Sequence, residues 1–275
     1  MSEVLCLYED DKYALRIVRD DYPENPREWD SLTTMAYGHK KYKLGDKEAD
    51  NTDLYNSWEE WLKGEVLNKY GKHNVVYLSL FLYDHSGISI NTTGFNCKWD
   101  SGQVGYIYTT KELLIKETGY TEQELFNTDK NRTPEIGERV RIAKFGNDWG
   151  QVVDTFVQAR QKVYKVDFDY YKIPDAKNVD RCVLIKKEDI TEVMAGYAYE
   201  ILKGDVETYN CYLKGDVFGF VLEEVIECAS CGDTEYDEID SCYGFYGYSL
   251  EEIKRELRGS IPQDAEYLID KLERV

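Results

Sequence analysis

The apolar positions of the chain recur mostly with the alternation that is typical of β-strands. The most apolar segment, VVYLSLFLY at 75–83, has the length and the β-branched start of a strand that is buried on both faces. Shorter alternating segments predict a hairpin from 4–8 and 13–18 and further strands at 87–93, 103–109, 217–227 and 241–247. These strands lack a βαβ rhythm, which predicts an α+β fold with a mixed or antiparallel sheet and flanking helices.

Helical spacing and capping residues predict helices at fewer places. Ser57 with Glu60 and Thr121 with Glu124 fit capping boxes, and Ser249 precedes two glutamates that suit a helix N-terminus. The predicted helices cover 28–37, 57–69, 111–117, 121–127, 188–213, 249–258 and 264–273. The segment 228–240 between two predicted strands is interpreted as an acidic turn region.

Residues 130–188 differ from the rest of the chain. Four short strands at 137–142, 150–156, 162–168 and 181–185 are separated by turn residues at nearly regular spacing, which favours a small β-barrel. The strings GERVRI, GNDWGQVV and VLI in this segment resemble SH3-like or KOW-type barrels. The resemblance implies a barrel at 130–188. We interpret it as an insertion, because the predicted helix after it resumes the larger domain, so 1–129 and 189–275 would form a discontinuous α+β core domain.

Charge is distributed unevenly along the chain. The 275 residues include 53 Asp and Glu against 34 Lys and Arg, a net charge of −19 that repels phosphate and excludes a generally basic nucleic-acid binder. The segment 130–188 nevertheless carries a net charge of +4. Its basic and aromatic side chains are interleaved, a pattern that suits phosphate contacts and base stacking. Binding of a peptide or partner protein and a purely structural insertion remain alternatives. The candidate nucleic-acid-binding residues are Arg139, Arg141, Lys144, Trp149 and Lys162.

The segment 216–253 is the most acidic part of the chain, with 11 acidic residues and no Lys or Arg. A solvated acidic surface explains most such segments. The alternative is phosphate mimicry, in which carboxylates compete with nucleic acid for a basic cleft of a partner protein. The candidate partner-binding residues are Glu223, Glu224, Glu227, Asp233, Glu235, Asp237, Glu238 and Asp240.

Two further groups of residues suggest metal chemistry. Asp84, His85 and Asp100 follow or precede predicted strands and would suit a divalent metal in a hydrolase or nuclease, unless they are simply turn residues. Cys228 and Cys231 form a CxxC motif, to which Cys211 and Cys242 would add thiolates for zinc. The neighbouring acidic residues are expected to raise the thiol pKa and to oppose redox activity. A solvated acidic loop is the alternative, so no cofactor is expected beyond this weak zinc or divalent-metal signal.

Several strings together resemble an uncharacterised protein family of phages, prophages and plasmids. They include NPREWD at 25–30, LGD at 44–46, YDHSG at 83–87 and WDSGQVG at 99–105. The resemblance implies a mobile element as the setting and names no reaction. We therefore expect a non-enzymatic acidic protein that binds a host protein, with inhibition of a defence nuclease by DNA mimicry as the leading hypothesis. A metal-dependent hydrolase and a nucleic-acid-binding accessory protein that acts through the barrel are the alternatives.

The chain also indicates its compartment. No segment approaches the roughly 20 apolar residues of a membrane span, and the N-terminal residues lack the basic start of a signal peptide. Seven cysteines, mostly scattered, fit reduced thiols. We therefore expect a protein of the host cytoplasm with no membrane partner.

Overall fold

The computed structural model describes residues 3–50, 52–97, 99–142, 149–158, 161–167, 182–247 and 249–275. The chain is an α+β protein, as the sequence predicts, and its described strands form three sheets. It divides into two compact units, one formed by 1–29 with 208–275 and the other by 30–207. The second boundary falls within the long helix α5 (Tyr197–Lys214). Each unit is described by itself.

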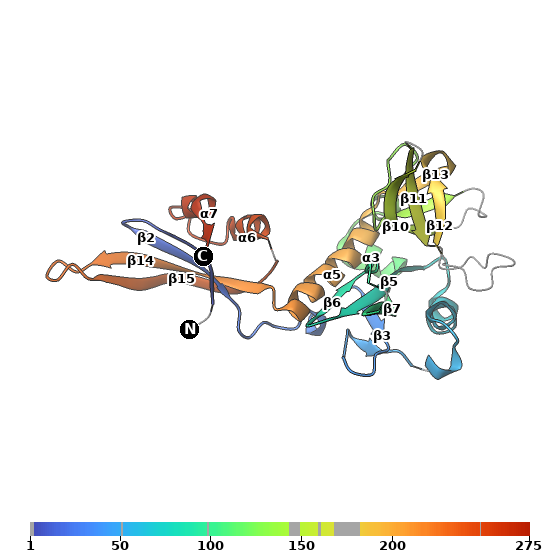
Figure 1. The fold of residues 1–275 in the computed structure, drawn as a ribbon, viewed down its shortest axis with the longest axis horizontal. Coiled ribbons are helices and arrows are strands. Elements are labelled where there is room, and N and C mark those ends of the chain that lie inside the picture. The colour runs from blue at the N-terminus through green and yellow to red at the C-terminus, as the bar shows by residue number, and fades with distance from the viewer. Residues whose placement is uncertain are drawn as a thin grey trace. The chain divides into compact units, whose positions relative to one another are not determined.

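The first unit is an antiparallel sheet covered on one face by helices. The predicted N-terminal hairpin is confirmed, and the strand order is β15-β14-β2-β1-β16. Alternate residues of β2 and β14, including Leu15, Ile17, Phe220 and Leu222, share a buried core with residues of helices α6 and α7. The two helices lie over one face of the sheet (Figure 1). The strands are β1 (Val4–Glu9), β2 (Tyr13–Arg19), β14 (Val217–Glu227), β15 (Thr234–Tyr246) and β16 (Glu273–Arg274), and the helices are η1 (Pro26–Glu28), α6 (Leu250–Leu257) and α7 (Tyr267–Lys271).

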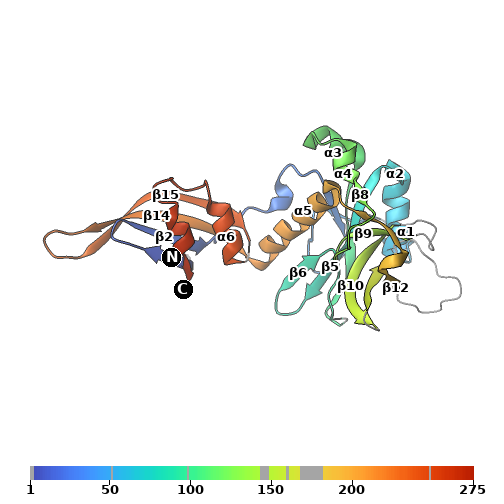
Figure 2. The ribbon, with the colours of Figure 1, turned by 90° about the horizontal axis from the view of Figure 1, so that it is seen from above.

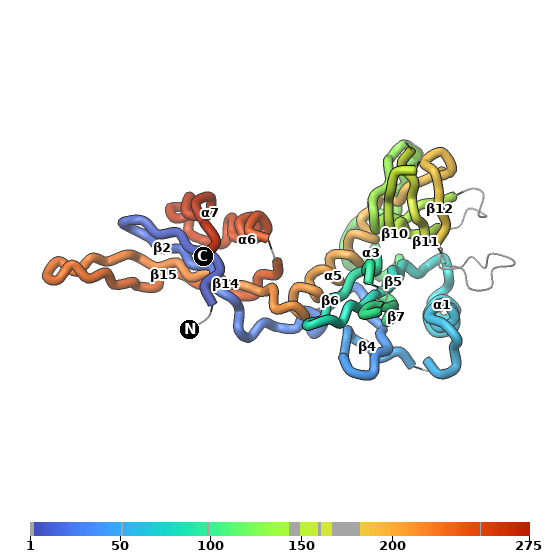
Figure 3. The backbone as a smooth tube through the Cα atoms, viewed as in Figure 1, coloured from blue at the N-terminus to red at the C-terminus, as the bar shows by residue number. Residues whose placement is uncertain are grey.

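The strands β14 and β15 form a hairpin that extends lengthwise past the start of β2 (Figure 3). The pairing with β2 ends at Glu224, whereas the pairing between β14 and β15 runs on to Glu227 and Thr234. Most of the predicted acidic turn region is therefore strand, because its residues find partners on β14. The turn itself is confined to 228–233.

The second unit contains a five-stranded sheet with the order β4-β3-β7-β5-β6. The apolar segment at 75–83 is confirmed as a strand in this sheet, where it pairs antiparallel with β7. A helical segment from Trp58 to Tyr70, capped by Ser57, packs Trp61, Leu62 and Val66 against this sheet. The elements are β3 (Thr34–Tyr37), β4 (Lys47–Glu48), η2 (Thr52–Leu54), α1 (Trp58–Trp61), η3 (Leu62–Leu67), α2 (Asn68–Tyr70), β5 (Val75–Asp84), β6 (Ile88–Asn91), β7 (Ser101–Thr110), α3 (Lys111–Thr118) and α4 (Glu122–Phe126).

The second unit also contains a six-stranded antiparallel sheet with the order β12-β11-β10-β9-β13-β8 (Figure 2). Its strands share one apolar core that includes Val140, Ile142, Tyr164 and Ile185. No pairing among the described residues joins β12 to β8, so the predicted small β-barrel is not confirmed. The elements are β8 (Thr128–Asp129), β9 (Arg139–Ile142), β10 (Trp149–Gln158), β11 (Gln161–Asp167), β12 (Cys182–Lys186), η5 (Lys187–Asp189) and β13 (Ile190–Met194).

Two predicted helices are wrong in part. The segment 28–37 contains only the end of η1 and then strand β3, which pairs with β7 and β4. The segment 188–213 begins with the end of η5 and strand β13, which pairs with β9 and β8, and the α-helix begins only at Tyr197. In both segments, pairing with strands distant in sequence outweighs the local helical preference. The predicted domain boundaries at 129/130 and 188/189 lie within the second unit, and the six-stranded sheet includes strands from both sides of them.

A cationic pocket as the candidate functional site

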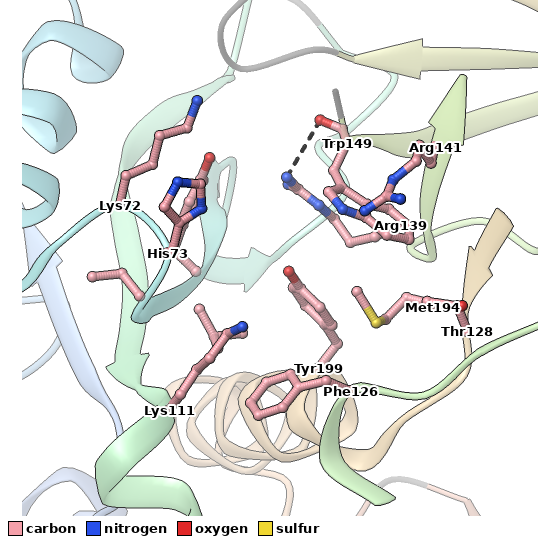
Figure 4. Close-up of a pocket in the computed structure, with 13 residues that line it drawn as sticks. Lys72, His73, Lys111, Phe126, Thr128, Arg139, Arg141, Trp149, Met194 and Tyr199 are labelled. Carbon is pink, nitrogen blue, oxygen red and sulfur yellow. Dashed lines mark hydrogen bonds between the residues drawn. The ribbon is translucent and has the colours of Figure 1, made fainter. Parts of the chain in front are cut away.

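A pocket of about 420 Å³ lies in the second unit, between the start of β5 and the strand β9 (Figure 4). It collects residues from eight elements or their flanking turns. Its polar and aromatic lining contains Lys72, His73, Tyr77, Lys111, Phe126, Thr128, Arg139, Arg141, Trp149 and Tyr199. Small-molecule pockets span roughly 300–1,000 Å³, so this volume suits a ligand at the smaller end of that range.

The alternation of β9 directs two arginines toward the pocket. Val140 and Ile142 are fully buried in the core of the six-stranded sheet. Because successive side chains of a strand point to opposite faces, Arg139 and Arg141 share the other face, where they line the pocket. The sequence RVRI therefore builds the sheet core and one wall of the pocket at the same time.

The antiparallel pairing of β5 with β7 brings three more basic side chains to the pocket. Val75 at the start of β5 lies opposite Thr110 at the end of β7. The N–H of Lys111 donates to the carbonyl oxygen of Asn74 at 2.7 Å, which joins the start of α3 to the turn before β5. Lys72, His73 and Lys111 thus line the same pocket, although nearly forty residues separate the turn from the helix.

Aromatic rings lie beside the cationic groups. The guanidinium of Arg141 lies 4.7 Å from the centre of the Trp149 ring, and the ammonium of Lys111 lies 4.7 Å from the Phe126 ring. The phenol of Tyr199 projects into the middle of the pocket (Figure 4). Such contacts favour the cations electrostatically and hold the flexible side chains in place.

The pocket is positive as well as aromatic. None of the described residues that line it is Asp or Glu. Arg141 is paired at its edge with Glu192, at 3.2 Å between Nη1 and Oε2. The Nε–H of Arg141 is buried and, among the described residues, donates to no acceptor. Arg139, only 5% exposed, donates to the carbonyl oxygen of Trp149 at 3.5 Å. Arginine beside an aromatic ring is the residue best suited to bind phosphate in a bidentate manner.

Three of the five predicted nucleic-acid-binding residues meet in this pocket: Arg139, Arg141 and Trp149. Lys162 lies on β11, where its ammonium is 5.4 Å from the Tyr164 ring, and it does not line the pocket. Lys144 lies outside the described residues. The sequence pattern does not single out four further lining residues, Lys72, His73, Lys111 and Tyr199. Antiparallel pairing of the predicted strands at 75–83 and 103–109 would have indicated the first three of these.

The predicted hydrolase residues lie next to one another without forming a metal centre. Nδ1 of His85 is 3.5 Å from Oδ2 of Asp100. The N–H of Asp84, the last residue of β5, donates to the carbonyl oxygen of Asp100, just before β7, at 2.8 Å. The Asp84 carboxylate instead accepts from Tyr42 at 3.1 Å and pairs with Lys41 at 3.6 Å. Among the described residues, no group of three or more His, Cys, Asp or Glu side chains is arranged to hold a metal ion.

The eight predicted acidic residues all lie on the β14–β15 hairpin or its turn. Their strands place Glu223 opposite Glu238 and Glu224 opposite Asp237. Glu223 forms an ion pair with Arg16 of β2, which offsets part of this charge. The remaining side chains are exposed, except that Asp240 is half-buried. The acidic side chains are therefore distributed over the exposed hairpin and its turn.

The four predicted zinc thiolates do not converge. Cys211 is buried in α5 and Cys242 is exposed on β15, whereas Cys228 and Cys231 share the turn of the hairpin. The hydroxyl of Ser230 lies 3.1 Å from the sulfur of Cys228. Hydrogen bonds from Ser230 and Cys231 lower the pKa of the Cys228 thiol to about 6. The expectation that neighbouring acids raise this pKa is wrong, because hydrogen bonds at the exposed turn outweigh screened charges.

Wider comparisons leave the site to be interpreted from its own chemistry. In the part of the chain that the structure describes, no helix combines the length and the apolar character needed to cross a bilayer. The chain was compared with models of known protein families, with curated proteins and with solved structures, and nothing matched.

Proposed function

We propose that this protein binds a single-stranded nucleic acid, or a nucleotide at its end, through the cationic pocket. The observation that carries the proposal is the lining: five basic side chains and four aromatic rings, with no acidic residue among the described lining residues, in a chain of net charge −19. Basic residues placed together against the average charge of the chain indicate an anionic ligand. The sequence-based alternative of a nucleic-acid-binding accessory protein takes this specific form.

Screening reconciles the pocket with the acidic chain. At physiological ionic strength the Debye length is about 8 Å, so acidic residues farther away are largely screened from a bound phosphate. The arginine and lysine groups of the pocket act at contact distance in a partly desolvated site. A hydrogen bond to a charged group contributes about 1.5–3 kcal/mol there. The local field of the pocket therefore decides binding, and the net charge slows nonspecific association.

The aromatic rings favour a ligand that carries bases. Stacking of a base on an aromatic side chain contributes about 1–3 kcal/mol and tolerates any sequence. Trp149 and Phe126 each lie beside a cation, so a base and its phosphate can be held by neighbouring groups. A hollow of about 420 Å³ accommodates an inserted nucleotide, whereas a duplex is bound by elements that project into its grooves.

The test is binding of a fluorescein-labelled ten-nucleotide single strand, as DNA and as RNA, followed by fluorescence anisotropy at two salt concentrations. Arg141→Gln and Lys111→Gln should each weaken binding by roughly tenfold or more, because each removes a charge-assisted contact. Each change should also reduce the slope of the logarithm of the binding constant against the logarithm of the salt concentration by about one. Arg141 and Lys111 are preferred to Arg139, whose burial makes a folding defect a competing explanation.

Lys162→Gln is the matched control. It removes the same charge from an exposed position of the same six-stranded sheet, outside the pocket. It should leave the affinity within about twofold, since a screened surface charge contributes little. Equal losses for Lys162→Gln and Arg141→Gln would assign binding to the general surface and contradict the pocket. Absence of binding to either strand at low salt would contradict the proposal as a whole.

A second candidate function is the leading hypothesis from the sequence. In it, the protein is an acidic inhibitor that a mobile element encodes, and its target is a defence nuclease of the host. The register of the hairpin supports it, because Glu224 opposite Asp237 sets like charges against each other at a cost to folding. A basic partner would relieve that repulsion. Retention of one stoichiometric host protein at low salt and its loss at high salt would support this candidate. Retention unaffected by neutralising Glu224 and Asp237 would exclude it.

A further inference from the structure

The turn between β14 and β15 holds two cysteines of the same chain close together. Cys228 and Cys231 are separated by two residues, and both are free thiols. The N–H of Cys228 donates to the carbonyl of Asp233 at 2.8 Å, and the N–H of Gly232 donates back to the carbonyl of Cys228 at 2.8 Å. Gly232 has a φ of 75°, a conformation that a residue without a side chain adopts at little cost. These bonds close the turn around the CxxC motif.

The closed turn surrounds the sulfur of Cys228 with hydrogen-bond donors. The Ser230 hydroxyl is 3.1 Å from this sulfur. Hydrogen bonds from Ser230 and Cys231 lower the pKa of the Cys228 thiol. Donors of this kind stabilise a thiolate in preference to a thiol. Cys231 is exposed and Cys228 is half-buried, so both sulfurs are accessible to a reagent from solvent.

We propose that Cys228 and Cys231 form a thiol–disulfide exchange centre at the tip of the hairpin, whose substrate is an organic disulfide with positively charged surroundings. The geometry assigns Cys228 as the attacking thiolate and Cys231 as the resolving thiol. The preference for a cationic substrate comes from Glu227, Asp233 and Glu235, which are all exposed, Asp233 within the turn and the two glutamates beside it. This inference rests on the first unit alone and does not depend on the cationic pocket.

The exchange balances in two steps. The Cys228 thiolate attacks one sulfur of the substrate disulfide, whose S–S bond breaks and whose other sulfur leaves as a thiolate and takes a proton from water. Cys231 then loses its proton to solvent and attacks the Cys228 sulfur, and the second substrate thiolate leaves. The two cysteines are oxidised by two electrons to an intramolecular disulfide, and the substrate disulfide is reduced to two thiols.

The first test uses cystamine, a small cationic disulfide, with the full chain and intact-mass and peptide analysis. The wild-type protein should lose two hydrogen atoms and contain a Cys228–Cys231 bridge. Cys231→Ser should stop at the mixed disulfide on Cys228, and Cys228→Ser should react roughly tenfold more slowly at pH 6, where few ordinary thiols are ionised. Cys242→Ser, which alters an exposed cysteine on the same hairpin, should behave as wild type. Accumulation of the mixed disulfide on wild-type Cys228 would overturn the resolving role of Cys231.

The second test examines the ionisation of Cys228 and the preference for a cationic disulfide in separate measurements. Alkylation of Cys228 by neutral iodoacetamide should reach half its maximal rate near pH 6 and level off above about pH 7, because the pKa of this thiol is lowered to about 6. A midpoint above pH 8 would overturn the thiolate. Added salt should slow the reaction with cystamine and accelerate the reaction with anionic glutathione disulfide. The same salt response for both disulfides would overturn the cationic preference.

Discussion

At the scale of single residues, two glycines of one strand illustrate how close approach limits the choice of side chain. Both occur in the string WDSGQVG, where the sequence indicates only a bulge or close packing for each. A Cβ atom on Gly105 would lie 1.9 Å from the carbonyl oxygen of Ala36 on β3, whereas one on Gly102 would have no heavy atom within 4 Å. The β5–β7 register also shifts between Leu80 and Phe81, next to Gly105.

Gly105→Ala is expected to separate β3 from β7 locally. The added methyl group meets backbone rather than a flexible side chain. Overpacking typically lowers the free energy of unfolding by about 1–3 kcal/mol, and we expect a loss at the upper end of this range or above it. Chemical denaturation measures this loss. Gly102→Ala, the same change three residues earlier, should stay within about 0.5 kcal/mol of wild type. Equal effects at the two positions would contradict the close approach to Ala36.

The residues of the candidate site also divide into those that the sequence pattern indicates and those that only the fold brings to the pocket. Arg139 and Arg141 can be selected from the sequence, because their alternation with apolar residues and the net charge of their segment are local properties. Lys72 and Lys111 cannot be distinguished from other surface lysines by their own sequence context. They reach the pocket only because β5 and β7 are antiparallel neighbours, which places the turn before one beside the helix after the other.

At the scale of elements, the β14–β15 hairpin is an edge structure with an unusual charge register. The edge strand β15 has 13 residues, all of them exposed or half-exposed. Natural edge strands are often protected from aggregation by charged side chains. Here the protection comes from one sign of charge on both strands, and Glu224 faces Asp237 directly. The element therefore combines solubility with internal repulsion.

Asp237→Lys should stabilise the first unit, because it replaces a like-charge pair with an opposite-charge pair worth about 0.2–1 kcal/mol. Thermal unfolding at low salt measures the change. Glu235→Lys makes the same charge change two residues earlier, opposite Ile226, and should give a smaller increase in stability. High salt should remove the difference between the two variants. Identical shifts at low salt would show that net charge, and not the pair with Glu224, decides the effect.

At the scale of the whole molecule, the chain builds separate apolar cores. Phe220 and Leu222 belong to the core under α6 and α7, Tyr106 and Trp61 to the core of the five-stranded sheet, and Tyr164 to that of the six-stranded sheet. The first unit is discontinuous in sequence, since 1–29 and 208–275 enclose the second unit between them. A unit with its own core can open without the other, which makes stability a local property in this chain.

Phe220→Ala and Leu78→Ala form a reciprocal pair for testing this independence. Both side chains are fully buried, Phe220 in the first unit and Leu78 in the second. Phe220→Ala should lower the free energy of unfolding by about 3–5 kcal/mol and Leu78→Ala by about 2–5 kcal/mol. Hydrogen exchange followed by mass spectrometry should become faster only in the unit that carries the substitution. Faster exchange in both units for either variant would contradict independent opening.

The sequence by itself determined the strand alternation, the helix caps at Ser57, Thr121 and Ser249, and the separation of a basic segment from an acidic one, because these depend on neighbours a few residues apart. Only the tertiary structure decided that 34–37 and 190–194 are strands, since their partners β7 and β9 lie far away in sequence. It likewise decided which basic residues share a pocket. Strand pairing sets distances between remote side chains, and no periodicity within one segment specifies its partner.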